Sequence, residues 1–145
     1  MQDTRFSIAI HLLVLLSEVD APMSSANMAQ SVGTNPSFVR KILSSLKRAG
    51  LLKSHRGRAG FSLVQPAADI TLLQIYQAVY NTNDVEIFAI HKNPSDKCLV
   101  GRYITPTLDD TFKGIRDATE QKMAETTLAD CIADMRKMAK RDGVL

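Results

Sequence analysis

The sequence predicts a mainly α-helical fold with one small β-hairpin and a long C-terminal helix. Two observations favour this fold. Apolar residues recur at spacings of three and four along most of the 145-residue chain, which is the period of amphipathic helices. Residues 51–64 instead hold two short strand-like runs around a glycine-bearing loop, which is typical of a hairpin.

Three helices are expected before the hairpin. The first, about residues 3–18, is apolar on most sides and should therefore be buried on most sides. The second covers about residues 25–32, and Gly33 supplies the left-handed turn that ends it. The third begins at Pro36 behind the N-cap Asn35, because proline tolerates the first helical position, where no N–H is needed.

Helical spacing returns after the hairpin. A fourth helix is predicted to start at Thr71, which has with Gln74 the spacing of a capping box. Residues 81–104 show no clear period and are predicted to form a loop or connector. A last helix is expected to begin at Thr126 or Thr127.

The long helix between this connector and the last helix is predicted to start with Thr105 as its N-cap and Pro106 at its first position. An apolar stripe follows at spacings of four and three, formed by Leu108, Phe112, Ile115, Thr119 and Met123. The predicted organisation is therefore an N-terminal domain of residues 1–80, a connector of residues 81–104 and a helical region of residues 105–145.

The positive charge is concentrated in the N-terminal half of the chain. The net charge is +3, but residues 1–65 carry +5 and the rest −2, and no carboxylate lies between Asp20 and Asp69. A one-signed block of this kind favours a polyanionic partner. Charge alone also allows a face that only keeps the protein in solution.

Two short helices joined by a glycine turn, followed by a basic hairpin, are typical of a winged helix-turn-helix that binds double-stranded DNA. Hydroxyls and cations on the outer side of residues 36–48 suit a major groove. Arginines at the hairpin tip can enter a narrow minor groove, although a solvated turn would look similar. The predicted base or groove contacts are Ser37, Arg40 and Lys41, and the predicted phosphate contacts are Lys47 and Arg48. The full predicted DNA-binding set is Ser37, Arg40, Lys41, Ser44, Lys47, Arg48, Lys53, His55, Arg56 and Arg58.

Four segments resemble the Rrf2 family of bacterial winged-helix transcription regulators: residues 24–33, 40–51 (RKILSSLKRAGL), 54–60 (SHRGRAG) and 70–76 (ITLLQIY). The resemblance implies a homodimer formed by the long helix, about Pro106–Glu125, with the apolar stripe as its interface. It also implies a near-palindromic operator, with repression as the usual mode. The wing is one residue shorter than is common in the family.

The resemblance also bears on cofactors. Cluster-binding members of the family carry three closely spaced cysteines before the long helix, whereas this chain has only Cys98 there. An iron–sulfur cluster normally needs four protein ligands, so no cluster or other cofactor is expected. No metal site is expected either, because His91 and Cys98 are too few ligands. Residues 91–94 resemble the cluster-free, YwnA-like branch of the family.

Cys98 is the candidate sensor residue. Lys97 and Arg102 lie close in sequence, and cations favour the reactive thiolate. The alternative is a small buried apolar residue, which is also the role expected for Cys131 on a helix face.

Other classes of protein fit the sequence less well. No glycine-rich phosphate loop, nucleophile elbow or paired zinc-binding histidines are present, so an enzyme is not expected. No stretch approaches the roughly 18 apolar residues of a membrane span. With two cysteines and no secretory signal, a cytoplasmic location is expected. The competing hypothesis is a protein-interaction scaffold that keeps the winged-helix fold without sequence-specific DNA binding.

Overall fold

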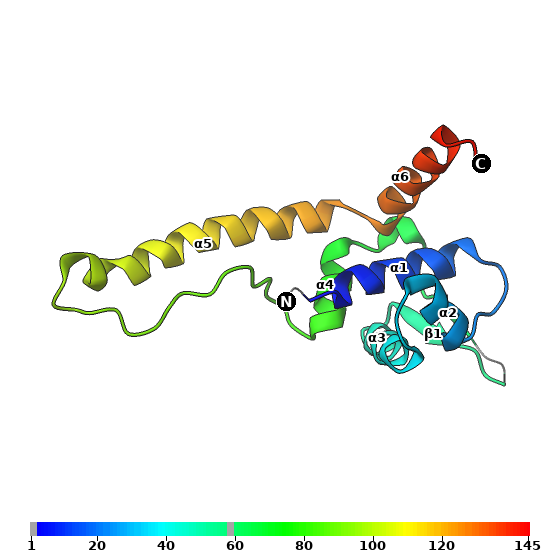
Figure 1. Ribbon diagram of the computed structural model, residues 1–145, viewed down its shortest axis with the longest axis horizontal. Coiled ribbons are helices and arrows are strands. Elements are labelled where there is room, and N and C mark those ends of the chain that lie inside the picture. Colours follow the sequence, from blue (N-terminus) through cyan, green and yellow to red (C-terminus); the bar gives the residue numbers. More distant parts are fainter. Residues whose placement is uncertain (1–2, 58–59) are drawn as a thin grey trace.

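The structure is a computed structural model that describes residues 3–57 and 60–145, and it confirms the mainly helical fold with one hairpin. The elements in chain order are α1 (Arg5–Glu18), α2 (Ser25–Val32), α3 (Pro36–Arg48), β1 (Leu52–Ser54), β2 (Phe61–Leu63), a 3-10 turn (Ala67–Asp69), α4 (Leu72–Tyr80), α5 (Leu99–Glu125) and α6 (Leu128–Arg141). Figure 1 shows a head built from α1–α4 and the hairpin, with α6 attached at its upper side and α5 projecting from it as an arm.

The predicted caps set the geometry of the helix-turn-helix. The Asn35 side chain accepts the Phe38 N–H at 2.9 Å, so α3 begins one residue later, at Pro36. Gly33 has φ +82°, and its N–H donates to the Ala29 carbonyl at 2.8 Å. This left-handed residue ends α2 and turns the chain directly into α3.

The core of the head lies between α1 and the helices around it. Its fully buried side chains include Leu12 and Leu13 of α1 together with Leu43 and Leu46 of α3. Leu128 of α6 is also fully buried. The C-terminal helix therefore completes the core of the N-terminal domain.

Hydrogen bonds and one ion pair fix α6 on the head. The Leu128 N–H donates to the Ile70 carbonyl at 2.8 Å, and Thr71 and Thr127 form an antiparallel bridge. Arg136 of α6 bonds both carboxylate oxygens of Glu18 at the end of α1, with Nη2–Oε2 at 2.8 Å. The predicted start of this helix is confirmed, because Thr127 is its N-cap and forms a capping box.

The prediction that the long helix starts at Pro106 is wrong. α5 begins at Leu99, behind Cys98, whose carbonyl accepts the Arg102 N–H at 2.9 Å. Pro106 lies inside the helix, where its missing N–H removes one hydrogen bond to the preceding turn. Because Pro106 and Arg102 are exposed, water can bond the carbonyl that loses its partner.

Residues 81–98 form no helix or strand and run back along α5, as Figure 1 shows. The contacts between this connector and the arm include a hydrogen bond and an aromatic pair. The Val85 N–H donates to Glu120 Oε1 at 3.2 Å, and the Phe88 and Phe112 rings lie 5.3 Å apart between centroids. Across residues 3–57 and 60–145, none of the helices is both long and apolar enough to pass through a membrane.

Candidate nucleic-acid interface

α3 has one apolar face and one polar face. Val39, Ile42, Leu43 and Leu46 are buried in the head. The opposite face exposes the six predicted contact residues of this helix: Ser37, Arg40, Lys41, Ser44, Lys47 and Arg48. The structure therefore brings the hydroxyls and cations predicted for the major groove together on one helix face.

Arg40 is anchored at the junction of the two helices of the motif. Its Nη1 donates to Ser25 Oγ of α2 at 3.2 Å, and its Nη2 donates to Ser37 Oγ of α3 at 3.1 Å. Ser25 is not among the predicted contact residues, and nothing in the sequence marks it as one. The N-cap of α2 is its neighbour Ser24, whose hydroxyl accepts the Asn27 N–H.

The hairpin lies beside the C-terminal half of α3. Lys47 Nζ of α3 donates to Ser54 Oγ of β1 at 2.8 Å, and Lys53 pairs in register with Ser62 of β2. Lys53 and Arg56 are exposed, while His55 is half-buried. The predicted contact Arg58 lies outside the described residues.

Gly60 attaches the hairpin to the loop before α2. Its φ is +112°, and a Cβ built on it would lie 3.0 Å from the Pro22 Cβ. A side chain at residue 60 would therefore be strained and crowded, so a glycine is needed for the wing to lie this close to the head.

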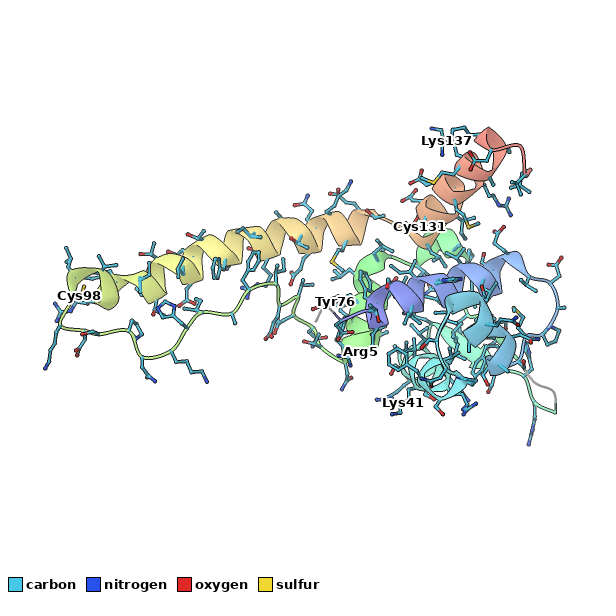
Figure 2. The ribbon with its side chains drawn as sticks, in the orientation of Figure 1. Arg5, Lys41, Tyr76, Cys98, Cys131 and Lys137 are labelled. Carbon is cyan, nitrogen blue, oxygen red and sulfur yellow. The ribbon has the colours of Figure 1, made fainter. Side chains whose placement is uncertain are left out.

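In the part of the chain that the structure describes, the cations of this face form no ion pair with a carboxylate. The ion pairs there involve Arg5, Lys113, Arg136 and Arg141, which lie at the start of α1, on α5 and on α6. In Figure 2, Lys41 projects from the lower side of the head, the side toward which the hairpin also extends. This surface combines concentrated positive charge with unused hydrogen-bond donors, as a phosphate backbone requires.

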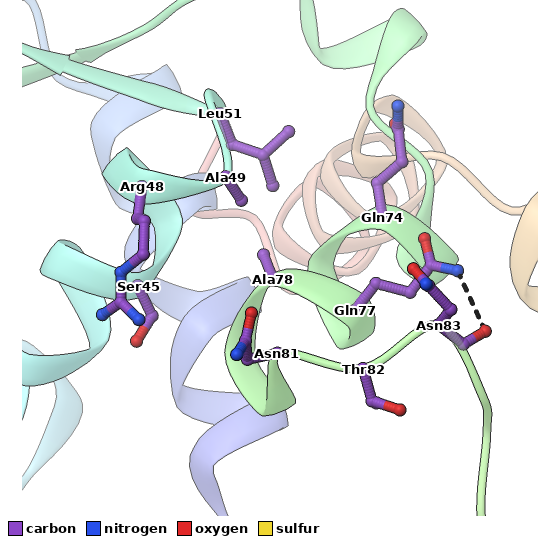
Figure 3. A pocket seen from close by; sticks show the side chains of 10 residues that line it. All are labelled: Ser45, Arg48, Ala49, Leu51, Gln74, Gln77, Ala78, Asn81, Thr82 and Asn83. Carbon is purple, nitrogen blue, oxygen red and sulfur yellow. Dashed lines mark hydrogen bonds between the residues drawn. The ribbon is translucent and has the colours of Figure 1, made fainter.

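A polar pocket of about 350 Å³ lies between α3 and α4, beside this face. Figure 3 shows Arg48 on its α3 wall and Asn81 on the α4 side. Two of the side-chain amides that line this pocket already form hydrogen bonds with backbone groups. Gln74 closes the capping box with Thr71, and Gln77 Nε2 donates to the Asn83 carbonyl at 3.5 Å. These amides therefore support the structure of α4 and the start of the connector.

Cys98 is exposed at the N-cap of α5, so the alternative of a small buried apolar residue is wrong. The pKa of its thiol is lowered, as predicted, but by a different cause. The nearby backbone N–H groups of Gly101 and Val100 favour the thiolate, rather than the neighbouring cations. Cys131 is half-buried on α6, and burial raises the pKa of its thiol. A sensor role for Cys98 stays a prediction.

The residues present do not fit an iron–sulfur cluster within one chain. Figure 2 shows Cys98 and Cys131 at opposite ends of α5. Within residues 3–57 and 60–145, no three His, Cys, Asp or Glu side chains gather as a metal would require. Two separated thiols cannot supply the four ligands that such a cluster normally takes.

The predicted interface stripe lies on the arm. Leu108, Phe112, Thr119 and Met123 are half-buried, and Ile115 is 41% exposed. Phe112 already contacts Phe88, which is itself 57% exposed. The connector therefore shares the apolar surface of the arm, a contribution that its lack of periodicity did not indicate.

The fold and its basic face define a class, the winged helix-turn-helix transcription regulators that bind DNA. Residues 2–134 match the model of the Rrf2 family, described as iron-dependent transcriptional regulators. The chain belongs to this family. It is 44% identical over 130 residues, or 90% of this chain and 96% of the other, to YwnA of Bacillus subtilis strain 168, a candidate HTH-type transcriptional regulator.

Solved structures agree with this assignment. A crystal structure of a candidate DNA-binding protein is 40% identical, has a TM-score of 0.72, and is matched over 88% of this chain and 98% of that one. The oxidized form of Staphylococcus aureus CymR shares the fold at a TM-score of 0.68, with 21% identity over 91% of this chain and 96% of that one. The protein is thus a DNA-binding transcriptional regulator and, as predicted, not an enzyme.

Proposed function

We propose that this protein is a repressor that binds a near-palindromic operator as a homodimer. The observation that carries the proposal is the exposed face of α3, whose cations have no carboxylate partner among the described residues. In a two-fold symmetric dimer, two such faces read two half-sites about one helical turn apart, so the operator mirrors the symmetry of the protein. A DNA-bound regulator of this kind acts in the cytoplasm.

Recognition is divided between two elements. Ser37, Arg40, Lys41 and Ser44 of α3 lie in the major groove, and Lys47 and Arg48 bind phosphates. Lys53, His55, Arg56 and Arg58 of the hairpin contact the adjacent backbone or minor groove.

The test of DNA recognition is footprinting of the bound genomic sites, followed by binding measurements on them. Arg40→Ala is expected to weaken operator binding by about 2–6 kcal/mol, because a homodimer loses two bidentate base contacts of about 1–3 kcal/mol each, and Arg56→Ala is expected to weaken it as well. Both side chains are exposed, so the melting temperature should stay close to that of the wild type. Unchanged binding in both variants would contradict the assignment of this face.

Dimerisation is assigned to the apolar stripe of α5. Ile115 is the cleanest site to test, because Phe112 also packs on Phe88 within the chain. Ile115→Asp should shift the protein toward monomer in sedimentation, since a charge would be buried against the partner. Val64→Asp is the matched control, because Val64 is 52% exposed on the head. If Ile115→Asp stays dimeric, the stripe is not the interface.

The proposed regulator works without an iron–sulfur cluster or other cofactor. The support is the ligand chemistry of the chain, in which Cys98 and Cys131 are the two available thiols. Anaerobic purification followed by iron and sulfide analysis tests this. About one cluster per chain would contradict it.

A further inference from the structure

Arg40 differs from the other cations of the face in how it is held. Its guanidinium donates to hydroxyls on two different helices, Ser25 of α2 at 3.2 Å and Ser37 of α3 at 3.1 Å. In the described part of the chain, Lys41 and Arg48 make no such side-chain bond, and the Lys47 ammonium bonds a single hydroxyl, that of Ser54. Arg40 is thus the cation whose orientation is fixed before any DNA arrives.

A fixed, planar guanidinium suits a base better than a phosphate. An arginine has five N–H donors, and the two serines use two of them, so three remain for a ligand. In the major groove, guanine offers two adjacent acceptors, O6 and N7, which a guanidinium bonds bidentately. Adenine instead places an N–H donor beside its N7, where guanine has the acceptor O6. A guanidinium that is not aligned with O6 and N7 of guanine loses one of the two hydrogen bonds.

We propose that Ser25 is a positioning residue, which with Ser37 aligns Arg40 to read one guanine in each operator half-site. The inference rests on the proposed function. It adds which base is read, and it adds that Ser25 of α2 orients the arginine that reads this base. Because Ser25 is half-buried and belongs to the first turn of α2, it also fixes the guanidinium relative to the neighbouring helix.

The test is selection of bound sites from a random duplex library, carried out with the full-length wild type and four variants. Wild-type protein should enrich one guanine in each half-site. Arg40→Lys should lower the preference for that guanine about tenfold, because an ammonium cannot form the fork. Ser25→Ala should lower it about threefold, because the guanidinium loses one of its two anchoring hydrogen bonds while the bond to Ser37 remains.

Two neighbouring variants separate positioning from general damage. Ser24→Ala removes the N-cap of α2, so it should lower the melting temperature while the guanine preference stays as in the wild type. Ser25→Thr keeps the hydroxyl and should retain the preference. Replacing the selected guanine by 7-deazaguanine removes N7 and should weaken wild-type binding more than binding by Arg40→Lys.

The outcomes distinguish failure of the proposed function from failure of the positioning role of Ser25. If the wild type binds no duplex, the proposed function fails. If it selects a site but Arg40→Lys or Ser25→Ala selects the same site with the same preference, the positioning role is wrong and the function stands. Loss of preference in Ser24→Ala equal to that in Ser25→Ala would also overturn the inference, because helix integrity would then explain both.

Discussion

Lys47 provides a quantitative test of where the DNA backbone lies. It is exposed at the C-terminal end of α3, its ammonium bonds Ser54 of the hairpin, and we assign it to a phosphate. Each neutralised phosphate contributes about −0.9 to the slope of log affinity against log salt concentration. A homodimer presents Lys47 twice, so Lys47→Gln should make the slope less steep by about 1.8.

That change is large enough to measure directly. Between about 50 and 200 mM salt, the wild type should lose about tenfold more affinity than Lys47→Gln. Fluorescence anisotropy with a labelled duplex of fixed length and random sequence gives the slope without knowledge of the operator.

Lys137→Gln is the matched control, because it removes the same charge from α6, which Figure 2 shows on the opposite side of the head from Lys41. Its slope should equal that of the wild type. Equal changes in the two variants would refute the reasoning, because the effect would then follow net charge and not a defined face. An unchanged slope in Lys47→Gln would remove this residue from the phosphate contacts.

Four further predictions concern the arm and the helix termini. Cys98 should react with iodoacetamide faster than Cys131 at neutral pH, because its thiol pKa is lowered and that of Cys131 is raised; peptide mass spectrometry gives both rates. Thr71→Ala should lower the free energy of unfolding by about 1 kcal/mol in urea titrations, because it removes the capping box of α4. Gly114→Ala should raise it by about 0.5–1 kcal/mol, because the new methyl group meets open space in the middle of a helix. Gly101→Ala should lower it, because its Cβ would overlap a carbonyl oxygen of the preceding turn; a gain in stability would contradict the packing at the start of α5.

Local signals in the sequence predicted most of the head. A cap such as Asn35, with Pro36 after it, and the glycine turn at residue 33 depend on backbone groups within a few residues, so they can be identified without knowing the fold. The same signals misled at Pro106. A proline after a threonine there has the pattern of a helix start, but the helix already begins at Leu99 and continues through Pro106.

In the candidate site, too, local sequence patterns predict some features, while others depend on the tertiary fold. The exposed face of α3 follows from helical periodicity, because Val39, Ile42 and Leu46 define its inner side. The bond between Arg40 and Ser25 joins residues fifteen positions apart on two helices, and no period or spacing in the sequence encodes that meeting. The contact of Phe88 with Phe112 is of the same kind, because it depends on how the connector folds back along α5.

The placement of α6 connects these observations. Leu128 is buried in the head, and Arg136 is paired with Glu18 of α1, so α5 is anchored at its C-terminal end to the DNA-binding domain. The connector anchors the same helix from the other direction through Val85 and Glu120. The connector and α6 thus both hold α5 to the head, and α1, which contacts α6, also packs against α3. In a dimer joined along α5, the angle between the two arms would thus set the spacing of the two recognition helices, and with it the spacing of the half-sites.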